Sequence, residues 1–150
     1  MKKNTVKTVP KSWGKELWIE NNKDYCCKVL TVVDGKRCSL HYHKEKKETF
    51  LVNKGSLRVL CCDLDKWDKQ APKLILPAAP ASFETLAETG VFEEFILNKG
   101  ESLTLEQFTL HTFTAYDCEY NRGGWATTLS CEFIETSTHH KDSDSHRIMI

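Results

Sequence analysis

The hydrophobic pattern of the chain alternates over short runs that are separated by turn-forming residues, such as Asp34-Gly35 and Asn98-Lys99-Gly100. A period of two residues is the pattern of a half-buried β-strand. We predict strands over residues 17–19, 25–33, 37–43, 48–53, 56–64, 92–98, 102–106, 111–117 and 126–136. Many short strands with turns between them predict an all-β sandwich or barrel.

Three stretches depart from this pattern. Residues 64–91 hold three of the four prolines, and a helical turn is predicted there, with Ser82 as N-cap and Gly90 as its stop. We interpret this stretch as a surface insertion without a role in the chemistry. Residues 1–11 are basic and polar, so we expect a flexible N-terminus. Residues 137–150 form a polar tail that is either disordered or lies across the barrel.

Composition places the chain in one class and excludes others. Its 150 residues suit a single domain over residues 1–150, and its 21 basic and 21 acidic residues cancel to zero net charge. This balance argues against a nucleic-acid partner. The chain has no apolar run of membrane-spanning length and no secretory signal at its start. Its 7 cysteines form no separated CxxC pairs. We interpret them as reduced thiols and expect a cytoplasmic protein without a membrane partner.

The stretch GKRCSLHYHKEKKETFLVNKG, residues 35–55, carries the strongest chemical signal. His41 and His43 are two residues apart on a predicted strand, so their side chains share one face. Glu48 begins the next predicted strand. If the two strands pair, Glu48 returns beside the two imidazoles. Two neutral nitrogens and a carboxylate oxygen make a site for a divalent first-row metal.

The spacing of Gly35, His41, His43, Glu48 and Gly55 resembles the first motif of the cupin family. This motif is long and specific, and with the second motif the resemblance covers about residues 13–135. It implies a single antiparallel jelly-roll barrel.

A second, weaker stretch, GESLTLEQFTLHTFTA, resembles the second cupin motif through Gly100 and His111. It departs from that motif where Glu106, Phe108 and Ala115 replace proline, glycine and asparagine. Together the two motifs imply that His41, His43, Glu48 and His111 bind one divalent ion, with Mn, Fe, Zn and Ni all compatible.

Each candidate residue has a simpler interpretation. The four metal-site residues could belong to a barrel that has lost its metal, but buried polar groups need partners, and an ion satisfies all four at once. Ser39 is a candidate to orient an imidazole. We interpret the remaining histidines as part of a solvated tail and not as ligands: His139, His140 and His146.

Two further stretches resemble one branch of the family, the cupin domain of type II mannose-6-phosphate isomerases. PKSWGKELWI is similar to their Arg-Pro-Trp-Gly opening, and Asp144 and Arg147 have the spacing of their closing Asp-x-x-Arg. The chain departs from them where His41 replaces glutamine and Lys46 replaces arginine. The resemblance implies a metal-dependent sugar isomerase.

The expected reaction interconverts an aldose and a ketose, free or phosphorylated. In this interpretation the three histidines hold the metal, and Glu48 is either the fourth ligand or the catalytic base. Sugar-stacking and phosphate-binding candidates are Trp13, Lys11, Lys15, Arg37 and Arg147.

Two other functions stay open at this point, an Fe(II)-dependent cupin dioxygenase and a non-catalytic sugar-binding cupin. We also expect a homodimer, because exposed sheet edges need cover. The strand around Leu17–Ile19 could supply that cover.

Overall fold

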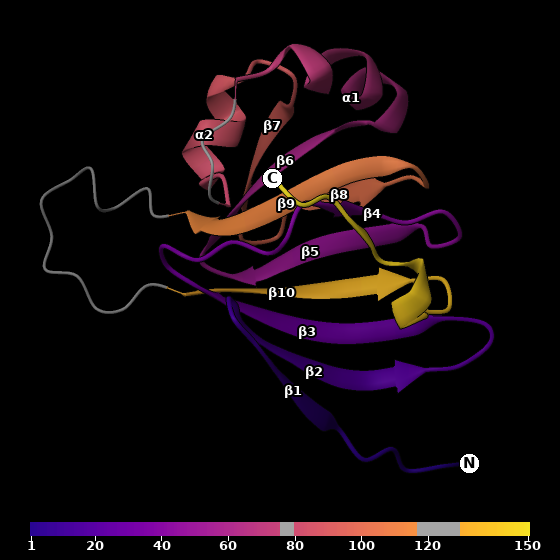
Figure 1. Cartoon of the computed structure of the whole chain (residues 1–150). Coiled ribbons are helices and arrows are strands. Elements are labelled where there is room, and N and C mark those ends of the chain that lie inside the picture. The colour runs from indigo at the N-terminus through magenta and orange to yellow at the C-terminus, as the bar shows by residue number, and fades with distance from the viewer. Residues whose placement is uncertain (76–79, 117–129) are drawn as a thin grey trace, which may run out of the picture.

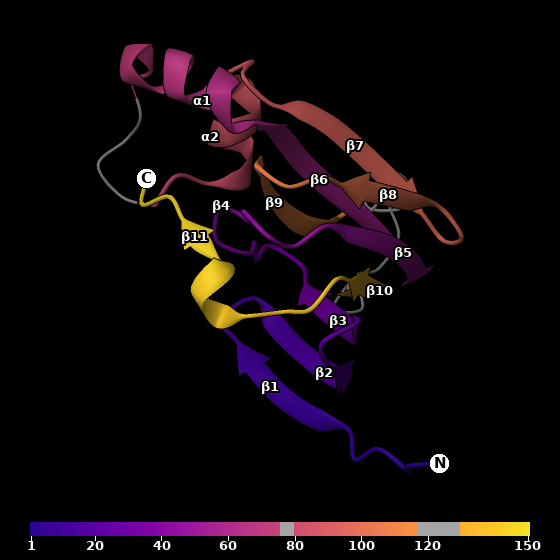
Figure 2. The same cartoon turned by 90° about the vertical axis from the view of Figure 1, so that its right-hand side faces the viewer.

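The computed structural model describes residues 1–75, 80–116 and 130–150, and most of them lie in two antiparallel sheets that face each other (Figures 1 and 2). The six-stranded sheet has the order β1-β2-β3-β10-β5-β8, and the five-stranded sheet has the order β11-β4-β9-β6-β7. The strands are β1 (Lys7–Lys11), β2 (Gly14–Asn21), β3 (Cys26–Val33), β4 (His41–Tyr42), β5 (Glu48–Lys54), β6 (Ser56–Asp63), β7 (Glu93–Asn98), β8 (Ser102–Leu105), β9 (Thr109–Tyr116), β10 (Ser130–Ser137) and β11 (His146–Arg147). The predicted all-β antiparallel architecture is confirmed.

Aromatic side chains from both sheets pack together between them. Phe50 of β5, Phe133 of β10 and Phe113 of β9 meet one another edge to face, with ring centroids 5.0 to 5.8 Å apart in the three pairs. These side chains are buried because strands β3, β5 and β10 alternate between inward and outward positions. Edge-to-face rings stabilise such a core beyond the area they bury.

The outer face of the five-stranded sheet is covered by the helices of residues 64–91, as Figure 1 shows. These are α1 (Leu64–Gln70), the 3₁₀ turn η1 (Ala71–Lys73) and α2 (Phe83–Glu88). Their buried Trp67 and Leu86 lie in one hydrophobic cluster with Leu60 and Leu110 of the sheet and with Leu40, which precedes β4. The predicted N-cap is confirmed, because the Ser82 side chain accepts a hydrogen bond from the Thr85 N–H. Within the described ranges, no helix is long and apolar enough to cross a membrane.

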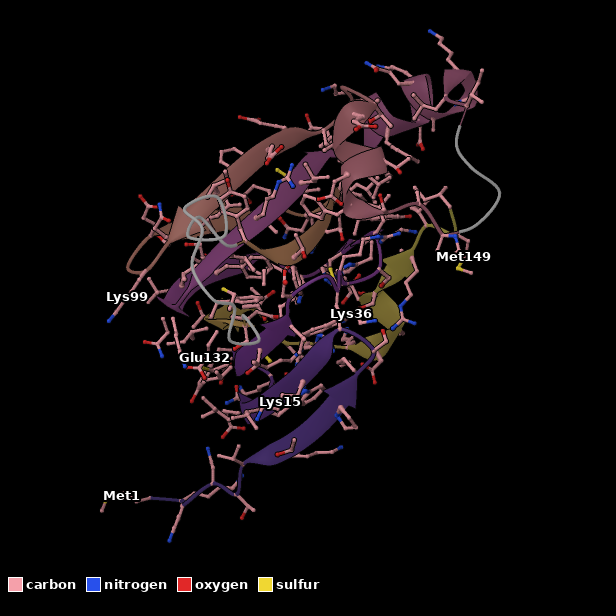
Figure 3. All side chains as sticks on the ribbon, turned by 90° about the vertical axis from the view of Figure 1, so that its left-hand side faces the viewer. Met1, Lys15, Lys36, Lys99, Glu132 and Met149 are labelled. Carbon is pink, nitrogen blue, oxygen red and sulfur yellow. The ribbon has the colours of Figure 1, made fainter. Side chains whose placement is uncertain are left out.

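The start of the chain is more ordered than the sequence predicts, and the tail takes one of the two forms that the sequence left open. The expectation of a flexible start is wrong for Lys7–Lys11, which pairs with β2, while the chain before it leads away from the barrel at Met1 (Figure 3). Pro10, which has no N–H to donate, is tolerated there because β1 is an edge strand. The tail lies across the barrel, where Asp142–Asp144 forms the 3₁₀ turn η3 and β11 pairs with β4.

The strand predicted over residues 37–43 shortens to two residues. Before β4 the chain follows β9 through an isolated bridge between Arg37 and Thr114 and a hydrogen bond from Cys38 N to Phe113 O. Strand β4 pairs with β9 and β11, and β5 lies in the other sheet, so the two motif strands do not pair. The turn predicted at residues 121–124 and part of the strand predicted over 126–136 lie outside the described residues.

Candidate metal centre

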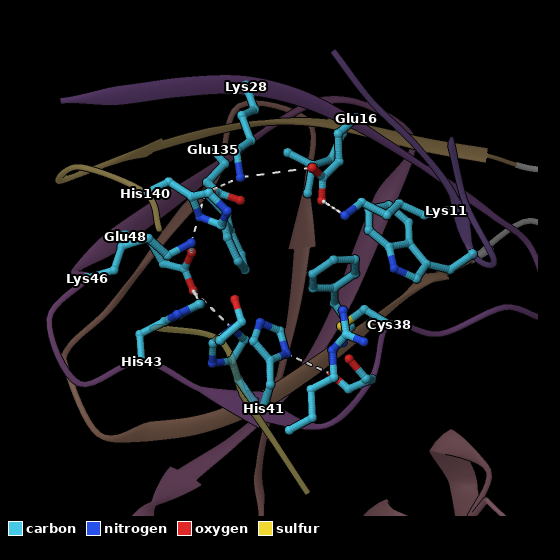
Figure 4. A pocket seen from close by; sticks show the side chains of 18 of the residues that line it. Lys11, Glu16, Lys28, Cys38, His41, His43, Lys46, Glu48, Glu135 and His140 are labelled. Atoms are coloured by element: carbon cyan, nitrogen blue, oxygen red, sulfur yellow. Dashed lines mark hydrogen bonds and ion pairs between the residues drawn. The ribbon is translucent and has the colours of Figure 1, made fainter. Parts of the chain in front are cut away.

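A polar pocket of about 550 Å³ lies between the two sheets, with Phe50 and Phe113 of the core among its lining residues. Figure 4 shows its labelled side chains around the cavity, with Lys46 and Glu48 beside His43, and with Glu16 and Lys11 on the opposite side. The inward positions of the strands are apolar in the core and polar here. Burial of so many polar side chains has a high free-energy cost unless each one finds a partner.

The fold brings together the three histidines that the sequence singled out. His41 of β4 is directly opposite His111 of β9 in the strand register, and His43 follows β4 immediately. One nitrogen from each ring lies within 4.8 Å of the others. The five-stranded sheet thus supplies three imidazoles to one point.

Backbone carbonyls orient each ring. The Nδ1 atoms of His41, His43 and His111 lie 2.7, 2.8 and 2.9 Å from the carbonyl oxygens of Ser39, Asp144 and Thr109. A carbonyl oxygen only accepts, so each Nδ1 carries the proton and each Nε2 keeps its lone pair. Neutral histidines in this tautomer are metal ligands. Ser39 therefore orients His41, through its backbone carbonyl.

Glu48 completes the set from the opposite sheet. Its Oε1 lies 2.9 Å from His111 Nε2 and 3.8 Å from His43 Nε2. All three atoms are buried, and none has a hydrogen-bond partner within residues 1–75, 80–116 and 130–150. Buried lone pairs that converge without a donor fit a cation, and three imidazoles with one carboxylate are a ligand set for a divalent first-row metal.

The pocket holds His41 and His43 neutral. Burial lowers the pKa of His43 to about 4, with Lys46 acting in the same direction. Burial and the neighbouring His111 also lower the pKa of His41 well below its usual value. The neutral imidazole is the form that coordinates a metal, so the environment favours binding near neutral pH.

Lys46 lies between two buried carboxylates. Its ammonium contacts Glu48 Oε2 and lies 2.9 Å from Glu135 Oε1 of β10. Burial alone raises the pKa of Glu48, but the adjacent charge of Lys46 outweighs it and holds that pKa well below its usual range. Lys46 likewise lowers the pKa of Glu135, and the two carboxylates raise the pKa of Lys46. All three groups are therefore charged at neutral pH.

The alternation of charges continues along the six-stranded sheet. Lys28 Nζ lies 3.7 Å from Glu135 and 3.9 Å from Glu16, whose other oxygen lies 3.3 Å from Lys11 Nζ. The local sequence pattern did not predict this row of paired charges, of which only Lys11 was a candidate, as a phosphate-binding residue. The signal was present, because Lys28 stands between Cys26 and Leu30 in phase with the buried positions of β3.

The predicted substrate-binding residues divide into two groups. Trp13 and Arg147 line the pocket, Trp13 buried against Phe113 and Arg147 exposed. Lys15, labelled in Figure 3, is exposed and does not line the pocket. Arg37 is also outside it, because its guanidinium donates hydrogen bonds to the backbone carbonyl of Ala81.

The interpretation of the tail histidines as solvated is wrong for His140. Its side chain is 9% exposed and lines the pocket, with Nε2 at 3.1 Å from Asp142 Oδ1. The side chain of Asn21 binds the His140 backbone through both its N–H and its carbonyl. A hydrogen-bonded partner from β2, 119 residues away in sequence, fixes this position, which the local pattern could not reveal.

Solved structures with the same fold share it at low sequence identity. CapF, a capsular polysaccharide assembling protein from Staphylococcus aureus, matches with a TM-score of 0.67 and 12% identity over 98% of this chain and 32% of its own. Oxalate decarboxylase from Lactobacillus farciminis matches with a TM-score of 0.59 and 16% identity, over 95% of this chain and 34% of its own. KdgF from Halomonas sp. matches with a TM-score of 0.57 and 12% identity, over 93% of this chain and 90% of its own. The chain thus spans about a third of the first two proteins. No curated protein matches the sequence.

The two-sheet antiparallel barrel, with its histidines and glutamate between the sheets, is a cupin jelly roll. More narrowly, the family model described as D-lyxose isomerase matches residues 6–128. The chain belongs to this family.

Proposed function

We propose that this protein is a divalent-metal-dependent isomerase that interconverts an aldose and its ketose. The observation that carries the proposal is the convergence of His43 Nε2, His111 Nε2 and Glu48 Oε1, all buried and without hydrogen-bond partners among the described residues, at one point in the pocket. His41, His43, Glu48 and His111 would hold one ion of Mn, Fe, Zn or Ni. The family match supports the sugar substrate.

An aldose–ketose isomerase moves one proton between C1 and C2 and another between the two oxygens. A bound divalent ion supplies a Lewis acid for the oxyanion that develops on the way. Glu48 directs Oε1 toward the imidazole nitrogens and Oε2 toward Lys46, which supports a role as ligand rather than as base. Coordination would lower its basicity further.

Glu135 is then the better candidate for the base that moves the carbon-bound proton. It is a buried carboxylate that lines the same pocket, and it shares Lys46 with Glu48. Lys46 is placed to hold both carboxylates in position and to donate a hydrogen bond toward a sugar oxygen. The sequence predicted Glu48 as either the fourth metal ligand or the catalytic base. In this proposal Glu48 is the ligand and Glu135 is the base.

The charges of the pocket favour a free sugar over a phosphorylated one. Among the described residues that line it, Lys11, Lys28 and Lys46 are each within 4 Å of a carboxylate. A sugar phosphate would need a cation that is not already neutralised. Arg147, exposed at the pocket, is the one lining cation for which the described residues show no such pair. A neutral pentose or hexose fits this arrangement better.

The test is to load the purified protein with Mn, Fe, Zn or Ni and to incubate each form with free and phosphorylated aldoses in deuterated water. We expect the ketose to form from a free sugar with deuterium at its C1, and the aldose re-formed in the reverse reaction to carry deuterium at C2. Glu135→Gln should abolish conversion. Glu132→Gln is the matched control, because Glu132 lies on the same strand but faces the other way.

Two outcomes would overturn the isomerase. Oxygen consumption by the iron form with an enol substrate, without conversion of any sugar, would support a cupin dioxygenase. Saturable sugar binding without turnover by any metal form would support a non-catalytic sugar-binding cupin.

We further propose that the protein is a homodimer that pairs through the outer face of the six-stranded sheet. Leu17, Val29, Ile134 and Leu51 stand in one cross-strand row on this face. The opposite sheet is covered by its own helices, whereas this row is only partly buried. The six strands hold 40 residues, which at about 3.3 Å per residue and about 4.8 Å between strands offer about 600 Å² per copy. Two copies would bury about 1,200 Å², the lower bound of a stable interface.

Light scattering tests this interface. Ile134→Lys should convert a dimer into a monomer, because it places a charge in the centre of the apolar row. Ile96→Lys is the control, since Ile96 is exposed on the other sheet. A wild-type protein that stays monomeric across a wide concentration range would contradict the proposal.

The proposed cellular location is the cytoplasm. Six cysteines of the described residues are free, and these include the neighbours Cys61 and Cys62, which lie on β6. Free thiols persist in a reducing compartment, which supports this location.

A further inference from the structure

The tail of the chain binds the segment that carries the metal ligands. It follows β10 and lies beyond residues 6–128, which match the family model. At one end, Thr138 exchanges two hydrogen bonds with the backbone of Lys47, at 3.1 and 3.2 Å. At the other end, β11 pairs with β4, and Ile148 N donates to Leu40 O at 2.9 Å. The tail therefore brackets residues 40–48.

Asp144 stands in the middle of this contact and is 5% exposed. Its carboxylate accepts hydrogen bonds from three successive backbone N–H groups, at 2.9 Å from Lys44, 3.1 Å from Glu45 and 3.0 Å from Lys46. Its own backbone carbonyl accepts from His43 Nδ1 at 2.8 Å. One residue thus binds both a ligand ring and the turn that follows it.

The turn between His43 and Glu48 depends on this carboxylate. Within the described part of the chain, no backbone carbonyl accepts a hydrogen bond from the N–H groups of Lys44, Glu45 or Lys46. Successive N–H groups that point into one concavity form an anion-binding nest. Asp144 fills that nest, so the direction in which the Lys46 side chain leaves the turn is set by the tail.

We infer that Asp144 is a positioning residue of the metal site, acting through His43 and Lys46. It fixes the Nε2 of His43 toward the other ligands and directs the Lys46 ammonium between Glu48 and Glu135. The inference rests on the proposed metal site and extends it, because it assigns part of that site to a segment outside the family match.

The test compares Asp144→Asn with Ser143→Ala. The asparagine amide keeps the shape of the side chain, but its NH₂ group cannot accept hydrogen bonds from the backbone N–H groups of residues 44–46. Ser143 is the matched control, since it lies in the same turn and is exposed. Isothermal titration with Mn²⁺ should show at least about tenfold weaker binding in Asp144→Asn, as for the loss of an outer partner of a metal ligand. The backbone carbonyl behind His43 remains in this variant, so the loss arises because the turn over residues 44–46 no longer binds a carboxylate and both His43 and Lys46 shift. Ser143→Ala should stay within about twofold of the wild type.

A second readout requires no metal and no activity. In nuclear magnetic resonance spectra of the metal-free protein, the amide protons of Lys44, Glu45 and Lys46 should lie downfield and exchange slowly, because they donate to a charged acceptor. In Asp144→Asn they should shift upfield. If that variant does not fold, the wild-type spectrum still decides, since rapid exchange of these amides would overturn the inference.

Failure of the inference is distinguishable from failure of the proposed function. A lower melting temperature in Asp144→Asn, with unchanged Mn²⁺ affinity and amide shifts, would make Asp144 merely structural and overturn the inference. Weakened Mn²⁺ binding in a protein that converts no sugar would support the inference while ending the isomerase proposal.

Discussion

His41 and His111 are directly opposite each other on strands β4 and β9, with their ring centroids 4.3 Å apart. They lie 70 positions apart in the sequence, and one register pair brings them together. A slip of one residue in that pairing would turn one of the two rings away from the pocket. The geometry of the site is therefore a property of strand register.

Replacing His111 with alanine should remove the metal. In the wild type we expect one divalent ion per chain and a higher melting temperature on loading, because the ion binds the folded state alone. In His111→Ala the gain on loading should disappear. Calorimetry with and without Mn²⁺ measures this, and His146→Ala, which removes a ring stacked on Tyr42, is the control. Stoichiometric metal retained in a His41→Ala, His43→Ala double variant would refute the ligand assignment.

Replacing Lys46 with methionine should destabilise the protein by about 3–5 kcal/mol, because two buried carboxylates lose their shared counter-charge. Adding Glu135→Gln to this variant should restore part of the loss, since it removes one of the uncompensated charges. Urea unfolding of the two single variants and the double variant gives the coupling. Lys47→Met, at an exposed lysine paired with an exposed glutamate, should have an effect of less than about 1 kcal/mol. Additive effects of the two buried substitutions would contradict the shared pair.

Gly14 and Gly35 should respond differently to alanine. Both have positive φ, 150° and 69°, so each variant bears backbone strain. A Cβ on Gly14 would meet Thr31 O at 1.9 Å, whereas a Cβ on Gly35 would meet nothing within 4 Å. Gly35→Ala should cost about 1 kcal/mol. Gly14→Ala should cost clearly more and should disturb Trp13 fluorescence. Chemical denaturation checks both, and equal losses of stability would show that the contact with Thr31 is unimportant.

The buried thiols should resist alkylation. Burial raises the pKa values of Cys38, Cys62 and Cys131 to about 12 each. Only the thiolate reacts, so at pH 8 the reactive fraction is small, and it grows as the pH approaches the pKa. Mass spectrometry of iodoacetamide-treated protein should find these three unmodified until the chain is unfolded. Cys118 lies outside the described residues, so Cys118→Ser is the suitable background. Modification of Cys38 at the rate of a free thiol would contradict this environment.

The sequence predicted the ligand set through local periodicity and a motif, and it predicted less of what surrounds the ligands. His41 and His43 share a face because of the strand period, which no tertiary contact is needed to establish. Glu48 reaches them across the two sheets rather than through a hairpin, because residues 37–40 follow β9. The sequence thus predicted correctly that Glu48 lies beside the two imidazoles, but the pairing of the two motif strands on which that prediction depended does not occur.

The row of buried charges was missed for a physical reason. A lysine or glutamate in a strand is ordinarily solvated, so the position of Lys28 in phase with its buried neighbours was not enough to predict that its charge is buried. The burial of Lys28 and Glu135 depends on partners from other strands, which a local pattern cannot supply. Phe108 shows the opposite case. It replaces the glycine of the second cupin motif, yet its φ is 59° and its N–H binds His43 O at 2.7 Å, so the turn survives the substitution.

The proposed metal ligands come from both sheets, with His41 and His111 on the five-stranded sheet and Glu48 on the six-stranded sheet. An ion bound by all three residues would link the two sheets of the barrel at the pocket, as a covalent cross-link would. In the metal-free protein, three buried acceptor atoms face one another in the pocket, and their mutual repulsion weakens the contact between the two sheets. Local opening of the barrel around the pocket, measured as the rate of proteolysis or of amide hydrogen exchange, should therefore decrease when the ion binds. Affinity for the ion and mechanical cohesion of the two sheets become one measurable quantity.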